Sequence, residues 1–506
     1  MDSPLWSRRW DLLLWALCAC AVAPLWWVAH PPLQDLPQHV AAIRVLHSHG
    51  DPHFGLSQLF DVHLWRTQYL LYYLCADLLS YVVDVEVANR LLVSACVIAT
   101  PLSMRALLAT LGRDERAALL TFPLTYNAHL ILGFFNFLSA IPLCLYGLSL
   151  AVRMRRAPSR RDAVLLSLVG VACFYMHIVP FAFLALGTLL CALSRSPREV
   201  LSRSLPMVPA LIAALLWAAR SPAGQATVEA AGGGTARAKA SFWSLEQASA
   251  QAPAWLTDVL RGDEDARLLW AWAGLWIVWA AAAQWPRSSS APDRLGRSLA
   301  RRLGLLTPLA LGAYMWTPTS YDWIWPIAPR FILLAALLSI IALPRPRPRA
   351  AGVLSVLVAL AGFAHFAQTG RAFEAFEQEV GDFDQAIEKI PPGKRVAGLI
   401  FSRGSKHVRF SPFIHYVAYY QARRGGAVMF TFADFAQSPF SFKADDRPPR
   451  VPPRWEWLPQ RVQPARDLAW YDYVLVRGGP GRIAADRKHY RRIHRSKRWS
   501  VWQRLR

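Results

Sequence analysis

The chain contains only seven cysteines among 506 residues, and all of them lie in apolar segments. None follows residue 370, so no disulfide framework supports the C-terminal part of the chain. The sequence also lacks a glycine-rich phosphate loop and any nucleotide-sugar motif. No internal repeat relates its two halves, and this argues mildly against a repeat-built transporter.

Acidic residues are scarce, with 33 Asp and Glu against 56 Lys and Arg and a formal net charge of +23. Nucleic-acid binding is one explanation of such an excess. Much of it, however, lies in short loops between apolar runs, where retention of Lys and Arg on the cytoplasmic side explains it. Residues 371–506 carry 26 basic against 13 acidic side chains, a net of +13. We therefore predict no nucleic-acid partner, and we interpret this part as facing membrane lipids through their anionic head groups or phosphates.

Long apolar runs dominate the first 370 residues. They cover 12–29, 88–111, 267–285 and 351–368, each close to the roughly 20 residues that cross ~30 Å of hydrocarbon. The sequence predicts a membrane protein, an all-α polytopic helical bundle of about 11 transmembrane helices over residues 1–370. Residues 371–506 are predicted to form a small soluble α/β domain.

Two apolar stretches, 117–152 and 163–194, are flanked by arginines and interrupted by polar residues near their middles. We interpret both as helical hairpins with their basic ends in the cytoplasm. The prediction is then an inner (plasma) membrane protein with a cytoplasmic N-terminus and an extracytoplasmic C-terminal domain. Its large outer loops are 30–87 and 221–266, and Gln68–Val83 in the first is expected to be an interfacial helix rather than a crossing.

In the C-terminal part, Arg395–Ser402 and Tyr473–Arg477 are predicted strands. A helix is predicted from Ser411 to about Arg424, ended by two glycines. Residues 443–467 are rich in Pro and Arg and are expected to be irregular. His415 lies at helical spacing from Tyr416 and Tyr420, and core packing is the expectation for all three.

The first outer loop begins with Pro31-Pro32-Leu33-Gln34-Asp35-Leu36-Pro37-Gln38-His39. One interpretation makes Asp35 the N-cap of a helix over 36–47, with Gln38 completing a capping box. Another makes Asp35 and His39, one turn apart on the same face, an acid/base or metal pair at the membrane surface. The spacing alone favours the cap.

At this point the chain resembles the GT-C superfamily of membrane glycosyltransferases, which includes protein O-mannosyltransferases, aminoarabinose transferases and many uncharacterised bacterial proteins. The resemblance covers the layout of the whole chain, and its residue-level support is confined to two short stretches. Asp35–His39 matches an Asp-Leu-Pro-(Asn/Gln)-His stretch, and Gly133–Phe137 matches a Gly-Phe-x-Asn-Phe turn. The resemblance implies that Asp35 is the catalytic base, with His39 beside it. A base and a cap are compatible roles.

Further site residues follow from the resemblance. It implies a cationic residue late in the chain that holds lipid phosphate, for which Arg330 is the candidate; an interfacial anchor is the alternative. His177 stands where many members have a lysine, and the turn containing Asn127 and His129 lacks the acid usual in better-known members. These three residues are therefore candidate substrate or phosphate contacts, and His177 also suits a satisfied intramembrane polar residue.

A metal site is an alternative at His47, His49, Asp51 and His53, where imidazole and carboxylate suit zinc, but the Gly-Asp-Pro turn there favours solvated loop. We assign no resident metal and no certain cofactor, with a divalent cation as an open alternative. The leading hypothesis is an inverting transferase that moves a sugar from a polyprenyl-phosphate carrier to a lipid, glycan or protein acceptor at the outer face. The alternative is a non-enzymatic transporter or an assembly scaffold for a surface polymer.

Overall fold

A computed structural model describes residues 4–225, 228, 240–257, 259–283, 291–321, 324–449, 451–479 and 481–505. The chain forms two compact units. Unit 1 contains residues 1–24, 93–130 and 134–370, and unit 2 contains residues 25–92, 131–133 and 371–506. The C-terminal part, from residue 371, shares its unit with most of the first outer loop, and the predicted division into domains of 1–370 and 371–506 stays a prediction.

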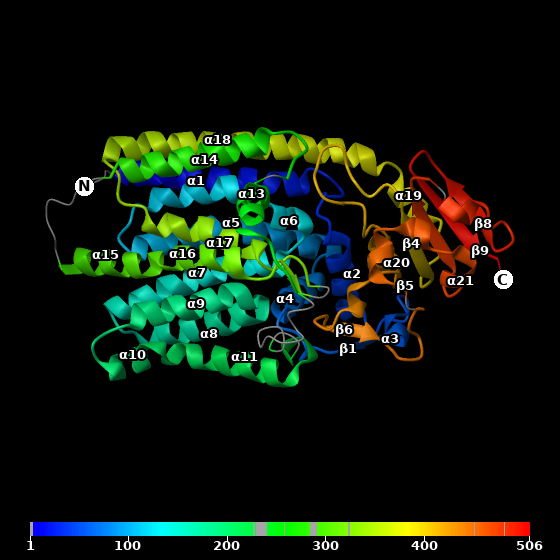
Figure 1. Ribbon diagram of the computed structural model, residues 1–506, viewed down its shortest axis with the longest axis horizontal. Helices are drawn as coiled ribbons and strands as arrows, with labels where there is room; N and C mark the ends of the chain where they lie inside the picture. The colour runs from blue at the N-terminus through cyan, green and yellow to red at the C-terminus, as the bar shows by residue number, and fades with distance from the viewer. Residues whose placement is uncertain are drawn as a thin grey trace. The chain divides into compact units, whose positions relative to one another are not determined.

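Unit 1 is built from helices that run side by side, with one two-stranded pair (Figure 1). Some of these helices continue into unit 2. The elements are α1 (Pro4–Trp26), α5 (Val85–Thr110), η1 (Glu115–Leu124), α6 (Ala128–Leu132), α7 (Phe135–Arg156), α8 (Arg160–Met176), α9 (Ile178–Ala192), α10 (Pro197–Ser204), η2 (Leu205–Met207), α11 (Val208–Arg220), β2 (Ala240–Ser241), α13 (Leu245–Leu256), α14 (Glu264–Ala281), α15 (Ala291–Gly304), α16 (Leu306–Trp316), β3 (Ser320–Tyr321), α17 (Pro329–Ala342) and α18 (Pro348–Val380).

Five helical segments of the described residues are long and apolar enough to cross a membrane. They are Arg8–Trp26, Val85–Thr110, Phe135–Arg156, Pro197–Arg220 and Pro348–Glu388, and shorter apolar helices lie at Leu70–Ser80, Ile178–Ala192 and Pro329–Ala342. The polytopic helical bundle with a small C-terminal sheet domain is thus confirmed. The count of about 11 crossings and their orientation stay predictions.

The predicted hairpin at 163–194 is found as α8 and α9, which meet at His177. Helices α7 and α9 approach closely where each presents a glycine. A Cβ on Gly147 would lie 2.6 Å from Leu184, and one on Gly187 would lie 2.3 Å from Leu148. Small residues allow such close packing of membrane helices without a hydrophobic driving force.

Arginines from several predicted cytoplasmic loops gather in one region of unit 1. Arg345 and Arg156 both lie within 4 Å of the Cβ position of Gly112. Burial and the nearby charges of Arg345, Arg301 and Arg297 lower the pKa of Arg113. The positive-inside interpretation requires these loops to share one side of the membrane, and their proximity agrees with it.

Unit 2 combines helices of the first outer loop with the C-terminal sheet. Its elements are α2 (Leu36–His47), α3 (Leu56–Leu59), β1 (Phe60–Val62), α4 (Leu70–Ser80), α19 (Phe383–Glu388), β4 (Arg395–Ile400), α20 (Val417–Arg424), β5 (Ala427–Val428), η4 (Phe432–Asp434), β6 (Phe440–Phe442), η5 (Pro453–Glu456), η6 (Pro459–Arg461), α21 (Pro464–Asp467), β7 (Tyr473–Arg477), η7 (Gly481–Ala484), β8 (Tyr490–Arg495) and β9 (Trp499–Arg504).

The main sheet has the strand order β5-β4-β7-β9-β8. Strand β4 pairs in parallel with β5 and β7, whereas β9 pairs antiparallel with β7 and β8. Both predicted strands are present, and β7 has the predicted bounds. The predicted helix from Ser411 is shorter than expected, because its first turn is replaced by non-helical turns and α20 begins at Val417. Gly425, at φ +72°, ends it as expected.

The first outer loop and the C-terminal part are joined within unit 2. Strand β1 pairs antiparallel with β6, with Phe60 opposite Phe442, and α2 packs against α20. Helix α4 buries Tyr72 and Tyr73 but exposes Leu74 and Leu78. An exposed apolar face of this kind suits the predicted interfacial helix.

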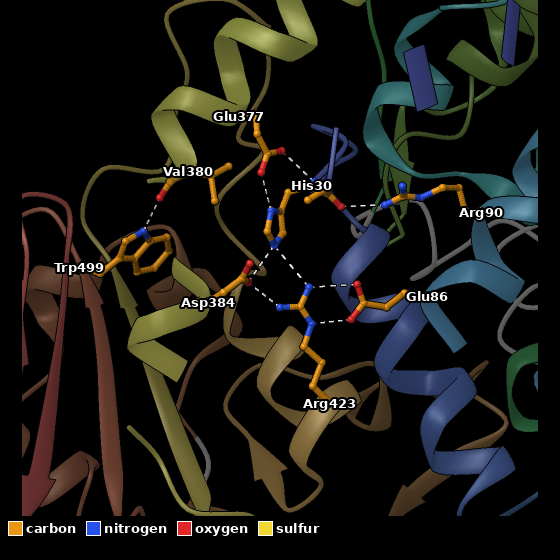
Figure 2. A network of polar contacts seen from close by, with 9 residues as sticks. His30, Glu86, Arg90, Glu377, Val380, Asp384, Arg423 and Trp499 are labelled. Atoms are coloured by element: carbon orange, nitrogen blue, oxygen red, sulfur yellow. Dashed lines mark hydrogen bonds and ion pairs between the residues drawn. The ribbon is translucent and has the colours of Figure 1, made fainter. Parts of the chain in front are cut away.

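A second connection within unit 2 is a polar network around the buried His30 (Figure 2). Its ring Nδ1 lies 2.9 Å from Glu377 Oε1, and its Nε2 lies 3.1 Å from Asp384 Oδ1. Arg423 donates to Asp384 over 2.6 Å and to both carboxylate oxygens of Glu86. The network therefore ties the segment after α1 to the start of α5, the end of α18, α19 and α20.

Candidate active site

Asp35 lies immediately before α2 and next to the short segment Ile131–Gly133, in unit 2. Its backbone N–H donates to the Leu132 carbonyl over 3.2 Å, and the Gln34 N–H donates to the Ile131 carbonyl over 2.7 Å. The backbone around Asp35 is thus fixed by hydrogen bonds to a segment distant in the sequence.

The capping-box interpretation of this motif is wrong. Asp35 occupies the N-cap position, but its side chain makes no capping hydrogen bond, and its φ of −91° and ψ of 1° differ from the extended backbone of a typical N-cap. The amide of Gln38, the other expected member, instead donates to the Phe430 carbonyl and accepts from the Phe432 N–H. Neither side chain folds back on the helix terminus.

The carboxylate of Asp35 faces the C-terminal part of unit 2. Its Oδ1 lies 3.2 Å from Nε2 of His415, and Nδ1 of the same ring lies 2.8 Å from Oε1 of Glu456. The exposed fractions are 18% for Asp35, 13% for His415 and 14% for Glu456. These three side chains form an ion chain, Asp35–His415–Glu456, that is mostly shielded from solvent.

The charges within this ion chain stabilise each other. Burial alone would lower the pKa of His415, but the Glu456 and Asp35 carboxylates raise it to about 10. Burial raises the pKa of Glu456, and the charge of His415 opposes this rise. His415 is therefore a cation at neutral pH, because opposite charges a few ångströms away outweigh the cost of desolvation.

His39 lies one turn after Asp35 and is held from both sides of its ring. Its Nε2 lies 2.9 Å from the Gly133 carbonyl, and its Nδ1 lies 2.9 Å from the Tyr73 hydroxyl. Burial lowers the pKa of His39 to about 4, so the ring is neutral. A carbonyl only accepts, so Nε2 carries the proton and Tyr73 donates to Nδ1.

Gly133 makes the close approach of this segment to Asp35 possible. Its φ of +91° is unfavourable for residues with a side chain, and a Cβ would lie 2.8 Å from Cβ of Asp35. Gly133 is also the first residue of the second stretch that carries the GT-C resemblance. The two stretches therefore meet at Asp35.

Two glutamines of the first motif hold the loops that carry the ion chain. Gln34 Oε1 accepts from the Ser411 N–H over 3.1 Å, four residues before His415. Gln38 holds the backbone at Phe430 and Phe432, and the Phe432 ring lies edge-on to His39 at 5.2 Å between ring centres. Gln34 and Gln38 thus hold the backbone near His415, the partner of Asp35, and at Phe432, which packs against His39.

Arg330, His129 and His177 lie in unit 1 and are linked through aromatic rings. The Arg330 guanidinium carbon lies 5.2 Å from the centre of the Phe134 ring. The Phe137 ring lies 5.3 Å from His129 and 5.3 Å from His177. The Phe134 ring also lies 6.1 Å from His129, so the three candidate residues form one cluster within their unit, and their role in binding phosphate stays a prediction.

His177 and Asn127 use some of their hydrogen-bonding atoms for contacts with nearby backbone groups. His177 Nδ1 accepts from the Val179 N–H over 3.1 Å and so caps α9. Asn127 donates to the Leu124 carbonyl and accepts from the His129 and Leu130 N–H groups. The structural alternative is thus realised at His177, and the roles of both residues in substrate binding stay predictions.

The histidines of the first loop do not converge on a common point. His47 Nδ1 lies 2.9 Å from Asp77 Oδ1, and His49 Nε2 lies 2.9 Å from the Phe60 carbonyl. In the part of the chain that the structure describes, no group of three His, Cys, Asp or Glu side chains is placed to hold a metal ion. The zinc alternative gains no support from this arrangement.

Sequence reasoning missed His415 and Glu456. His415 was expected to pack in the core, and Glu456 fell in the segment expected to be irregular. The available signals were weak: Glu456 is an isolated carboxylate between Trp455 and Trp457, and His415 is a polar residue in an aromatic stretch. Neither signal identifies Asp35 as the partner.

No family model matches this chain, and no curated protein sequence matches it. Among solved structures, the chain is similar to ArnT from Cupriavidus metallidurans in the apo state. The alignment covers 99% of this chain and 98% of that chain, with 13% sequence identity and a TM-score of 0.46. At this level of similarity, the match carries no argument about activity or mechanism.

Proposed function

We propose that the protein is a membrane glycosyltransferase of the GT-C type that uses a polyprenyl-phosphate-linked sugar at the outer face of the membrane. One observation carries the proposal. The two stretches that resemble this superfamily, Asp35–His39 and Gly133–Phe137, are far apart in the sequence, yet Gly133 contacts both Asp35 and His39. The carboxylate of Asp35 is also not used as a helix cap.

In the proposed reaction, Asp35 is the general base. Its carboxylate takes the proton of the acceptor hydroxyl while the acceptor oxygen attacks the anomeric carbon of the sugar. The bond from that carbon to the phosphate oxygen breaks, polyprenyl phosphate leaves with the electron pair, and the configuration inverts. His39 is neutral and held by Tyr73 and Gly133, so it suits an orienting role beside Asp35.

The departing phosphate requires a positive partner. Arg330 is the proposed cation, because guanidinium pairs bidentately with phosphate oxygens. His129, His177 and Asn127 are proposed as further donor contacts. The sugar and the acceptor are not assigned.

The test is release of polyprenyl phosphate from labelled lipid-linked sugars by the purified full-length protein. Asp35→Asn keeps the size of the side chain but accepts no proton, so the turnover rate is expected to fall by about 10²–10⁴-fold. Asp77→Asn is the matched control, because Asp77 also pairs with one histidine, at 2.9 Å, within unit 2. Its rate should stay within a few fold of wild type.

Folding of both variants is checked by detergent-solution chromatography and circular dichroism. A folded Asp35→Asn protein that retains most of its activity would exclude Asp35 as the base. If the wild-type protein releases no polyprenyl phosphate but moves a lipid-linked sugar across vesicles, the transporter alternative is correct.

A further inference from the structure

The ion chain contains two residues for which the proposed reaction has so far given no role. Among the described residues, Asp35 and Glu456 are the side-chain partners of His415, one at each ring nitrogen. His415 is likewise the ion-pair partner of each carboxylate. The arrangement is a three-residue line that begins at the proposed base and ends at Glu456, the last residue of η5.

Geometry determines the protonation of His415. An ionised carboxylate has no proton to donate, so a ring nitrogen that faces it must carry a hydrogen. A neutral imidazole has only one such N–H, whereas both nitrogens of His415 face carboxylates at 3.2 Å and 2.8 Å. With both carboxylates ionised, both hydrogen bonds therefore exist together only when His415 is an imidazolium.

The surroundings of the ring agree with this geometry. The carboxylates raise the pKa of His415 to about 10 against the effect of burial. The neighbouring His39 is neutral near pH 7, so it adds no competing positive charge. Asp434 is a further carboxyl group near Glu456; burial raises the pKa of Asp434, although the charge of Arg447 opposes this.

We propose that His415 is a positioning residue for Asp35, and that Glu456 keeps both ring nitrogens of His415 protonated. This role rests on the proposed function. The Nε2–H group of His415 occupies Oδ1 of Asp35, so Oδ2 is the oxygen that accepts the proton. The acceptor O–H bond breaks as the Oδ2–H bond forms, while both protons of His415 stay on its nitrogens.

Two effects follow from this arrangement. The imidazolium places a positive charge beside a carboxylate that is mostly buried. It also fixes the rotation of the carboxylate, which directs one defined oxygen toward the acceptor. Loss of the second proton of His415 would leave a lone pair facing a carboxylate, and the hydrogen bond on that side would be lost.

The first experiment measures the charge of His415 without using activity. Histidine labelled with ¹³C at Cε1 is incorporated into the full-length protein in micelles, and the pH titration is followed by NMR. The His415 signal is the one that is absent in His415→Gln. We expect His415 in the wild-type protein to remain protonated above pH 8.5.

Glu456→Gln preserves a hydrogen-bond acceptor at Nδ1 but removes its charge. The pKa of His415 is then expected to fall by about 1–3, which is the usual effect of one nearby opposite charge. Glu456→Asp retains the charge and should restore part of this loss. A wild-type His415 that titrates near 6.5, or an unchanged titration in Glu456→Gln, would overturn the proposal.

The second experiment follows the rate of polyprenyl phosphate release against pH. In Glu456→Gln, the alkaline fall in kcat should begin at least one pH unit lower than in wild type, with KM little changed. His47→Gln is the matched control, because His47 is also partly buried but pairs with one carboxylate, Asp77. An identical pH profile for wild type and Glu456→Gln contradicts a positioning role.

The two experiments separate the two claims. If no variant and no wild-type protein releases polyprenyl phosphate, the proposed function fails, and the positioning role fails with it. The NMR titration then still decides whether Glu456 maintains the charge of His415. If transfer occurs and depends on Asp35 but not on Glu456 or His415, only the positioning role is wrong.

Discussion

Removing the His30 side chain should weaken the contacts within unit 2 between residues 25–92 and residues 371–506. In His30→Ala, Glu377 and Asp384 both lose the ring nitrogens that now lie 2.9 Å and 3.1 Å away. The ring of His30 is only 2% exposed and packs 5.5–6.1 Å from the aromatic rings of Phe383, Tyr416 and Tyr419, measured between ring centres. The variant therefore loses both polar and packing contacts.

The expected cost is about 3 kcal/mol. A hydrogen bond to a charged group contributes about 1.5–3 kcal/mol, and the contact with the 30%-exposed Glu377 falls in the lower part of that range. Asp384 is 53% exposed, so solvent screening reduces its share to below about 1 kcal/mol. Lost aromatic contact adds about 0.5–1.5 kcal/mol.

Hydrogen exchange measured by mass spectrometry tests this value. A loss of about 3 kcal/mol makes local opening about a hundredfold more frequent. Amides of α19 and α20 should therefore exchange about a hundredfold faster in His30→Ala. In the control His47→Ala, which loses one carboxylate contact at 2.9 Å, the change should stay below about tenfold. Equal exchange in both variants would refute the role given to the His30 network.

The same experiment has a pH dependence with a defined sign. Burial lowers the pKa of His30, but its hydrogen bonds to Asp384 and Glu377 outweigh this, and the net pKa is raised. Stabilisation by the charged ring is complete below the ordinary histidine pKa of about 6.5 and is lost as pH rises through the raised value. The difference between wild type and His30→Ala should therefore shrink at alkaline pH.

Three further outcomes are expected. Gly133→Ala places a Cβ 2.8 Å from Cβ of Asp35 at a φ of +91°, so polyprenyl phosphate release should fall at least tenfold while the protein still inserts in membranes. Residues 371–506 expressed alone should bind a hydrophobic dye and resist proteolysis poorly, whereas co-expression with residues 25–92, which supply β1 and α2, should protect them. A reporter in the loop after α7 should be active only in the cytoplasm, and activity outside would overturn the hairpin interpretation.

The sequence predicts this fold well where the signal is local. Long apolar runs locate the membrane helices, because crossing hydrocarbon requires a fixed length of apolar chain. The bounds of strand β7 were predicted correctly because its five residues, all buried, give a strong local pattern. The end of α20 was predicted because glycine readily adopts the positive φ that Gly425 takes there. These features depend on neighbours within a few residues.

The helix start before α20 was missed for a tertiary reason. Ser411 and Pro412 have the composition of a helix N-terminus, but the Ser411 N–H is bound by the side chain of Gln34. The Phe413 N–H donates to the Arg403 carbonyl over 3.2 Å. These bonds hold residues before Val417 in turns, and no local pattern encodes partners so far away in the chain.

The same reason explains the error at Asp35. The residues around Asp35 have the sequence pattern of a capping box. The competing partner, His415, is far away along the sequence although it contacts Asp35 in the fold. A cap contributes about 1 kcal/mol and leaves the carboxylate beside neutral N–H groups. Pairing with a buried imidazolium is the stronger interaction for a carboxylate that is itself mostly shielded from water.

The cost of burying these charges supports the proposed role of Asp35. Asp35, His415 and Glu456 are all mostly buried, and burying two carboxylates with one imidazolium leaves a net negative charge in a poorly solvated place. Replacing buried charges by apolar residues of similar volume is often neutral or stabilising, so stability alone does not explain this arrangement. The proposed general base, in contrast, is an ionised carboxylate before it takes the proton. In the proposed reaction the ion chain provides this carboxylate, because His415 supports the charge of Asp35 and Glu456 supports the charge of His415.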